Sequence, residues 1–459
     1  MEMMFNRNDD EESDEELQLL EQYNAAFLSP CIVMMLRQSL MTKTALVVLD
    51  TTEDAYDDEY GEGSIDTRTT RRRTPSFFDQ RLLWEAFCDR HGARADFKRH
   101  IRMSKASFDK LLSLIRCDLE VDENKARSRG GAILPELRLY CCLRFCAGGS
   151  YSDIKFFIGI STASFYRVVW ICIDAINKCP ALSIDFPTTR DEVLRAAKGF
   201  TSISSQGCIW NCVSVIDGYH LQIKAPSKSE VKNVKSFFSG HYQTHGINIQ
   251  AACDHNCRFQ FIGVAGPGVM GDRDAINQIR LGSLIESLPG LYCAIGDCAY
   301  TPSEHLVPIF RGDMARNVRN DNFNFFASQL RIRIEMAFGL MVKKWGILSR
   351  PLDIKVRHIK RLIVAIGRLH NFCIDERLAS VHDKHQEHEH QQQQQGGLWQ
   401  TAFTPTNVEF ECHETMMRAT AAEIEYDEMI AAFECPWSYN RDRMAREVEA
   451  LRLTRPKKF

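Results

Sequence analysis

Three carboxylates, widely separated along the chain, are the residues best suited to chemistry. Asp217 ends the apolar run at 208–216, and Asp297 ends a second run, "LYCAIGD", at 291–297. Glu335 lies in a segment with helical spacing, one residue around from its apolar face. That face is formed by Leu330, Ile334, Phe338, Met341 and Trp345.

Two neighbouring strand ends and one covering helix can bring three carboxylates together. Like charges at contact distance repel, so such a cluster needs a cation. Mg²⁺ or Mn²⁺, hard cations that prefer oxygen ligands, would relieve that repulsion. Two such ions can activate a water or a 3′-hydroxyl and stabilise a leaving oxygen, which is phosphodiester chemistry.

Each carboxylate also has a purely structural interpretation. Asp217 and Gly218 form a dipeptide that is typical of hairpin turns. Asp297 could cap a helix beginning near residue 302, and Glu335 could pair with Arg331 or Arg333 on a helix surface. The residues alone leave both interpretations open.

The segment 205–380 has the pattern of elements that would position these side chains. Short β-branched or aromatic runs at 208–216, 221–226, 245–254, 258–266 and 291–297 are separated by Gly, Pro, Asp and Asn. Helical patterns follow at 274–288, 302–310, 322–348 and 356–378. This order predicts a mixed α/β sheet covered by helices.

Residues 76–195 are predicted to be all-helical, and 151–173 resembles a helix-turn-helix. Ile154 and Phe157 would pack the first helix, Gly159 would form the turn and Ser161 would cap the second helix. A helical bundle without DNA contact has the same pattern, so both interpretations stay open. The second helix would present outward Thr162, Ser164 and Arg167.

Charge is distributed unevenly along the chain. Residues 1–66 contain 17 acidic and 3 basic residues, a net charge of −14, and the remainder has a net charge of +11. An acidic, disordered segment at 1–75 and a basic body suit an anionic partner such as nucleic acid, although a solvated basic surface has the same balance. A basic cluster closes the segment and could be a nuclear-localisation signal, a phosphate-contacting arm or a linker: Arg68, Arg71, Arg72 and Arg73.

The remaining segments give further expectations. Residues 381–400 are predicted to be a low-complexity linker, and 401–459 a helical extension. We expect an intracellular protein without a membrane span. The three-residue gaps between Cys208 and Cys212 and between Cys253 and Cys257 argue against a structural zinc site and favour buried thiols.

Several ordered blocks between about 95 and 375 carry a family resemblance. "VIDGYHLQIKAP", "AIGDCAYTPSEHLVPIF" and "SQLRIRIEMAFGLMVKKWGIL" hold the three acids, with "HGINIQAACDHNCRFQFIGVAGPGVMGDRDA" between the first two and "LHNFCIDE" after the third. Upstream, "IRMSKASFDKLL" and the helix-turn-helix segment also fit. These blocks resemble the PIF/Harbinger transposases and the nucleases derived from them, a DDE-type endonuclease family.

The resemblance implies an RNase H-like mixed sheet flanked by helices, preceded by an all-α helix-turn-helix-like domain. It implies that Asp217, Asp297 and Glu335 bind divalent metal and catalyse cleavage and joining of DNA at transposon ends. A Myb-like accessory protein, a nuclear location and a homo-oligomer are the corresponding expectations. The alternative is a domesticated, catalytically idle DNA-binding factor on the same scaffold.

The chain departs from the family pattern near 240–272. His241, Gln243 and His245 replace a basic pair, and Asp272 lies in "GDRDA", where a strand-end turn or helix cap is the structural interpretation. His220 could orient the site or simply bond within a turn. DNA contacts are expected from a set of basic residues, for which a solvated helix face is the alternative: Arg167, Lys343, Lys344, Lys355, Lys360 and Arg361.

Overall fold

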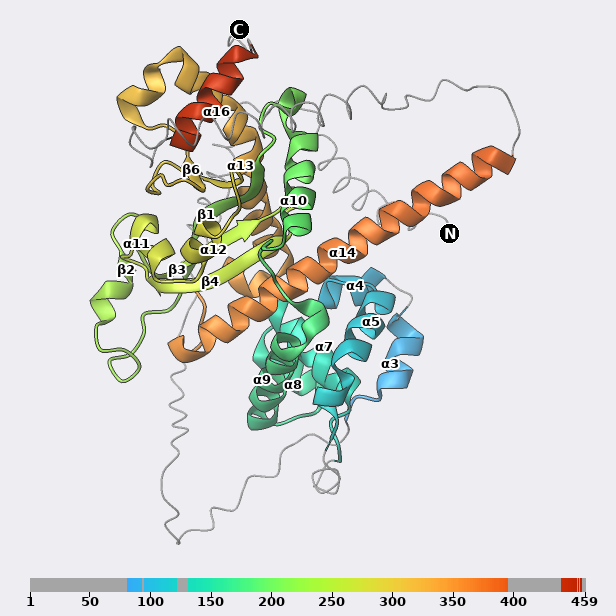
Figure 1. Ribbon diagram of the computed structural model, residues 1–459. Helices are drawn as coiled ribbons and strands as arrows, with labels where there is room; N and C mark the ends of the chain where they lie inside the picture. Colours follow the sequence, from blue (N-terminus) through green and yellow to red (C-terminus); the bar gives the residue numbers. More distant parts are fainter. Residues whose placement is uncertain are drawn as a thin grey trace, which may run out of the picture.

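The computed structural model describes residues 81–92, 95–121, 131–394 and 439–451, together with 453 and 455. The predicted acidic segment at 1–75, its basic cluster and residues 401–438 lie outside the described residues. Figure 1 shows a sheet region and a group of N-terminal helices on either side of one long helix, α14.

A mixed sheet forms the centre of the segment 205–380, as the sequence predicts. Its order is β4-β3-β1-β5-β6, with the short β2 paired to β3. The pairs β1–β3 and β3–β4 are antiparallel, whereas β1–β5 and β5–β6 are parallel. The strands are β1 (Cys212–Gln222), β2 (Phe238–Ser239), β3 (Thr244–Cys253), β4 (Phe259–Pro267), β5 (Cys293–Gly296) and β6 (Leu306–Pro308).

Helices cover both faces of this sheet, because successive side chains of its buried strands point to opposite sides. Val215 of β1 belongs to the core that includes α13 (Val318–Lys344) and the first part of α14 (Val356–Gln394). The next residue, Ile216, belongs to a second core with α10 (Arg190–Ile203), α11 (Asp272–Asn277) and α12 (Leu281–Glu286). The predicted apolar face of α13 is buried throughout.

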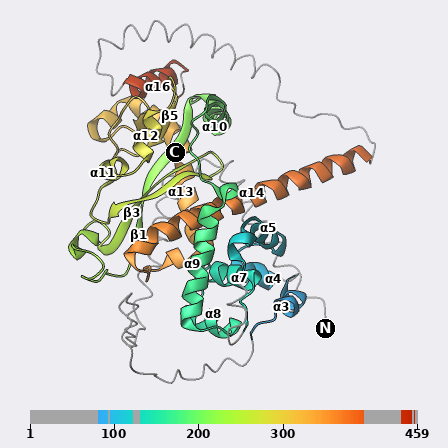
Figure 2. The same ribbon diagram turned by 60° about the horizontal axis from the view of Figure 1, so that its bottom comes forward.

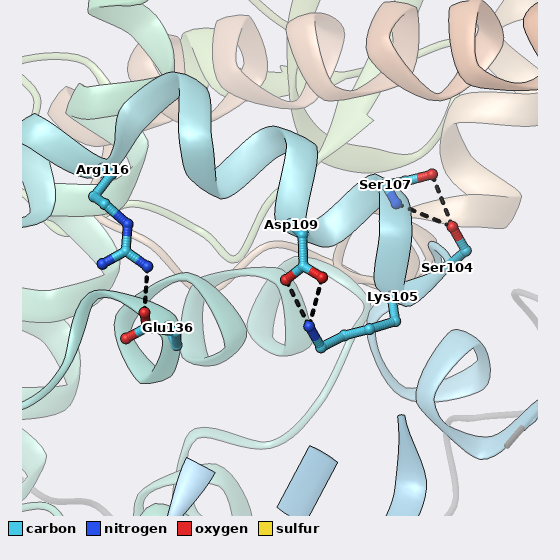
Figure 3. Close-up of polar contacts among 6 residues, drawn as sticks. All are labelled: Ser104, Lys105, Ser107, Asp109, Arg116 and Glu136. Carbon is cyan, nitrogen blue, oxygen red and sulfur yellow. Dashed lines mark hydrogen bonds and ion pairs between the residues drawn. The ribbon is translucent and has the colours of Figure 1, made fainter. Parts of the chain in front are cut away.

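The N-terminal region is helical, as expected. Its helices are α3 (Trp84–His91), α4 (Ala95–Ile101), α5 (Lys105–Ile115), α7 (Pro135–Cys146), α8 (Tyr151–Ile158) and α9 (Thr162–Lys178). Ser104 caps α5 by accepting a hydrogen bond from the Ser107 backbone N–H. Lys105 pairs with Asp109 one turn later at 2.6 Å, and Arg116 pairs with Glu136 of α7 (Figure 3).

Contacts between α5 and α14 join the N-terminal helices to the sheet region. Lys110 Nζ lies 2.6 Å from Glu376 Oε1, and Ser107 donates to the other oxygen of the same carboxylate. Both views show α14 running between the two regions (Figures 1 and 2). Short 3₁₀ helices link the elements at Arg116–Leu119, Pro180–Leu182, Ser205–Gly207, Val234–Phe237, Gly312–Arg316 and Gly346–Ser349.

The geometry of α8 and α9 follows the local sequence. Their axes differ by 100°, and Gly159 between them has a left-handed backbone (φ 76°), which glycine adopts without a Cβ penalty. Ser161 caps α9. Phe157 is 47% exposed, contrary to expectation, because Ile158 takes the inward position beside Ile154.

Two predictions about local structure are wrong. Asp217 does not end a strand: β1 continues through it, with Asp217 opposite Ala251 and Gly218 opposite Gln250 on β3. Continuous pairing with β3 outweighs the turn preference of Asp-Gly. The expected helix at 302–310 is instead a loop and β6, which extends the parallel part of the sheet.

The C-terminal part of the chain is more helical than its composition suggests. α14 continues to Gln394, so most of the predicted linker at 381–400 is helix; Gln, Glu and Lys favour this conformation. In the predicted extension, α16 (Tyr439–Ala450) buries Met444, Ala445 and Val448. Its Asn440 donates to the backbone oxygens of Leu291 and Glu304, next to β5 and β6.

No single helix in the described part of the chain is long and apolar enough to cross a membrane. Only the bent pair α8 and α9 reaches that composition, when its two helices are taken together.

Candidate active site

The three predicted acids lie on the α13 side of the sheet. β1 and β5 are parallel, with Val215 opposite Ile295. Two residues further along the chain are Asp217, within β1, and Asp297, directly after the last residue of β5; by the alternation of the strands both fall on the side of Val215 and Ile295. Glu335 projects from the helix that covers this side, so the structure brings together residues that are 80 and 38 positions apart in the sequence.

Arg331 lies among these carboxylates. Its Nη1 is 3.4 Å from Asp217 Oδ2, and its Nη2 is 2.6 Å from Glu335 Oε1. The exposed fractions of the three side chains are only 16%, 18% and 23% for Arg331, Asp217 and Glu335. The expected pairing of Glu335 with Arg331 is therefore present, but the same guanidinium also reaches across to the sheet.

The electrostatics of the cluster are dominated by burial. Burial raises the pKa of Asp217 to about 7; Arg331 and the Gly218 backbone N–H oppose the shift, while Asp297 and Glu335 add to it. Burial alone would lower the pKa of Arg331, but Glu335, Asp217 and Asp297 together raise it. The guanidinium thus stays charged across the range in which Asp217 titrates.

Asp297 is oriented by the turn that follows β5. Its Oδ1 accepts a hydrogen bond from the Ala299 backbone N–H, and the chain then runs through a loop to β6. The alternative role as a cap for a helix near 302 is wrong, since no helix begins there. The carboxylate is held by its own turn at the edge of the cluster.

A second polar cluster lies on the opposite side of β1. Asp272 is the first residue of α11, and its Oδ1 accepts from Gln250 Nε2 at 2.8 Å and from Asn248 Nδ2 at 3.1 Å. The Tyr300 hydroxyl donates to Gln250 Oε1 at 2.6 Å. We call these four residues the Asp272 network; they connect β3, α11 and the loop that carries Asp297.

The Asp272 network explains Gly218. A Cβ at this position would lie 2.1 Å from Asp272 Oδ1 and 2.8 Å from Gln250 Nε2. Glycine after Asp217 is therefore required by the close approach of the network, not by a turn. Asp272 also has a more specific role than a strand-end turn, because its carboxylate receives two side-chain amides.

The segment that carries these acids matches a known protein family. Residues 216–371 match the family model described as DDE superfamily endonuclease. The match begins one residue before Asp217 and includes Asp297 and Glu335. It supports a DDE transposase-like nuclease acting on DNA, and the mixed sheet flanked by helices is consistent with a DDE nuclease fold.

Comparison with curated proteins gave no match, and comparison with solved structures gave none.

The donor types of the site fit a divalent cation of the kind that DDE endonucleases typically use. Three carboxylates are the ligands that Mg²⁺ and Mn²⁺ prefer. Glu335 Oε1 is buried and forms an ion pair with Arg331 at 2.6 Å. Among the described residues, however, no group of three or more His, Cys, Asp or Glu side chains is arranged to hold a metal ion.

The residues predicted to contact DNA differ in how far they are exposed. Arg167, Lys343, Lys355 and Lys360 are exposed. Lys344 is half-buried, and its ammonium group interacts with the Cys373 thiol.

Arg361 has a structural role in this conformation. It pairs with Asp174 at 3.1 Å and lies 4.8 Å from the centre of the Trp170 ring, so it joins α14 to α9. His358 stacks on the same ring at 4.7 Å. Arg361 therefore presents less of its charge to solvent than the exposed lysines do.

His220 lies away from the acid cluster. Its ring stacks on Tyr242 at 4.4 Å, and its Nε2 is 3.2 Å from Thr244 Oγ1. These contacts join β1 to the start of β3 and to the segment before it, so His220 is hydrogen-bonded locally and does not orient the acids. Burial, followed by the neighbouring His241, lowers the pKa of His220.

Sequence reasoning missed the second contact of Arg331 and the roles of Gln250 and Tyr300. The role of Gln250 could have been predicted, because a buried amide within the apolar run 247–252 must find hydrogen-bond partners. Tyr300 follows Asp297 closely, but its partner lies 50 residues away. Nothing in the local sequence predicts such a distant partner.

Proposed function

We propose that this protein is a metal-dependent DNA endonuclease of the transposase type, which cuts and joins phosphodiester bonds at transposon ends. The observation that carries the proposal is the convergence of Asp217, Asp297 and Glu335 on one side of the sheet. All three lie inside the segment that matches DDE superfamily endonucleases.

The chain's own residues would hold the metal and fix its surroundings. Asp217, Asp297 and Glu335 would be its ligands, each on a different element. Two bound divalent ions would activate a water or 3′-hydroxyl and stabilise the leaving oxygen. Asp217 is fixed by the pairing of β1 with β3, Asp297 by its turn, and Glu335 by a helix whose apolar face is buried.

The finer assignment is to the PIF/Harbinger transposases. The ordered sequence blocks from about 95 to 375 support it, as does the sharp turn between α8 and α9, which suits a helix-turn-helix. We extend the proposal to a nuclear location, a Myb-like accessory protein and a homo-oligomeric complex on DNA. Exposed Arg167, Lys355 and Lys360 would contact phosphates.

A nicking assay on the full-length chain tests this function. Supercoiled plasmid is incubated with Mg²⁺, with Mn²⁺ or with EDTA, and a Glu335→Gln chain purified in the same way controls for contaminating nuclease. We expect nicking by the wild type with either ion and none with EDTA. The exposed Glu304 provides a matched variant, Glu304→Gln, that should cut like the wild type.

The same assay separates catalysis from binding. DNA binding without nicking under every metal condition would replace the endonuclease with the idle DNA-binding factor. If activity is present, terminal inverted repeats flanking the gene would provide the sequences on which end cleavage and strand transfer can be measured.

A further inference from the structure

The position of Arg331 suggests a function that the ligand assignment does not include. We propose that Arg331 is an internal counter-cation of the acid cluster, and that a divalent ion must displace its guanidinium in order to bind. The inference rests on the proposed function, since it concerns the same three carboxylates.

The geometry makes Arg331 a bridge between two elements. It lies one helical turn before Glu335 on α13, which fixes the contact between their side chains at i,i+4 spacing. The contact with Asp217 extends from the helix to the centre of β1. The guanidinium therefore touches two of the three proposed ligands, which come from different parts of the chain.

Burial limits the screening of this bridge by solvent. Arg331 and Asp217 are each less than one-fifth exposed, so water screens their interaction weakly. A guanidinium cannot lose its proton to make room for another cation. A metal ion that uses the facing oxygens of Asp217 and Glu335 would meet a like charge at short range, so the side chain has to move.

The charge balance explains why an internal cation is useful. Without a cation, three carboxylates on one side of the sheet repel one another. One guanidinium reduces that repulsion but leaves an excess of two negative charges when all three acids are ionised. The site can thus fold without metal and still attract divalent ions. Arg331 acts through the ligands and is therefore a positioning residue.

Mn²⁺ binding to the full-length chain without DNA tests the inference. Free Mn²⁺ is followed by electron paramagnetic resonance during a titration of wild type, Arg331→Gln and Arg331→Lys. Arg331→Gln should bind Mn²⁺ at least about tenfold more tightly, because a cation within 4–6 Å shifts carboxylate equilibria by that order. Arg331→Lys, which keeps the charge but loses the planar fork, should fall between the two.

A matched control comes from an exposed ion pair. Arg316 contacts Asp313 at 2.9 Å, and both side chains are more than four-fifths exposed. Arg316→Gln removes the same charge from the chain and should bind Mn²⁺ like the wild type. Equal tightening in Arg316→Gln would show an effect of net charge and would overturn the specific role of Arg331.

Thermal unfolding gives a second readout. Without metal, Arg331→Gln should unfold at a lower temperature than the wild type, and Mn²⁺ should raise its midpoint by more than it raises that of the wild type. If Arg331→Gln binds Mn²⁺ equally or more weakly while wild type still nicks DNA, the inference alone is wrong. If neither chain binds Mn²⁺ and no metal-dependent nicking occurs, the proposed function fails with it.

Discussion

The two sides of β1 carry polar clusters of opposite character. On the α13 side, Asp217 and Glu335 meet through the charge of Arg331, at distances of 3.4 and 2.6 Å. On the other side, Asp272 is held by hydrogen bonds from the neutral amides of Asn248 and Gln250. One cluster is therefore held by charge and the other by directional hydrogen bonds.

This difference separates a site that can exchange its partner from one that is fixed. Under the proposal above, another cation replaces the ion pairs of the guanidinium, whereas the Asp272 network satisfies specific donors and acceptors. The network also joins β3 to the loop of Asp297 through Tyr300. The network therefore supports the proposed reaction site from the opposite face of the sheet.

The largest expected effect comes from neutralising an acid on the α13 side. Asp217→Asn, Asp297→Asn and Glu335→Gln should each lower the rate of metal-dependent nicking by about two to three orders of magnitude, because each weakens a proposed ligand of the divalent ions that would stabilise charge on the reacting phosphate. Circular dichroism should show that all three variants fold. Wild-type rates in all three would exclude these residues as ligands.

The pH dependence of stability should report on Asp217. Because the folded-state pKa of Asp217 is raised to about 7, the folded chain binds a proton that the unfolded chain has lost. Stability without metal should therefore fall as pH rises from about 4 towards 7, by up to a few kcal/mol.

Asp217→Asn should remove that contribution and flatten the profile, measured by urea unfolding at pH 5 to 8. Gly240→Ala, which changes no titratable group, serves as the comparison and should keep the slope. A wild-type profile that rises over this range would contradict the raised pKa of Asp217.

Substituting Gly218 should damage the network side directly. A Cβ would overlap Asp272 Oδ1 at 2.1 Å, so Gly218→Ala should cost about 1–3 kcal/mol in free energy of unfolding. Gly240 has nothing within 4 Å of its ideal Cβ, and Gly240→Ala should be close to neutral. Equal costs in urea unfolding would remove the packing argument for Gly218.

The smallest effect is expected from Tyr300→Phe. It removes one hydrogen bond to Gln250 and should lower the free energy of unfolding by about 1 kcal/mol, while nicking stays within a few-fold of wild type. Tyr166→Phe, at a more exposed tyrosine, controls for the loss of a hydroxyl. A much larger loss of nicking than of stability would place Tyr300 in the reaction itself.

Periodicity predicted the elements that depend on burial. The apolar face of α13 and the strand before Asp297 follow from spacing alone, because buried side chains must repeat with the period of their element. The family resemblance then selected Asp217, Asp297 and Glu335. The structure places these acids on one side of the sheet, and their catalytic roles remain predictions.

Long-range pairing accounts for what the sequence could not predict. Asp-Gly favours a turn locally, but β3 pairs with β1 on both sides of this dipeptide and keeps the strand extended through Asp217. The two contacts of Arg331 join residues 114 and 4 positions apart, and only the nearer one is a helical neighbour. Partners that lie across the sheet leave no local signal.

The central claim is that the charged side of β1, and not the hydrogen-bonded side, carries the chemistry. Its most direct test compares the initial nicking rates of Asp297→Asn and Asp272→Asn with Mn²⁺, at a temperature where both variants are folded. The account predicts that Asp297→Asn is inactive while Asp272→Asn keeps most of the wild-type rate. Equal losses, or loss only in Asp272→Asn, would contradict it.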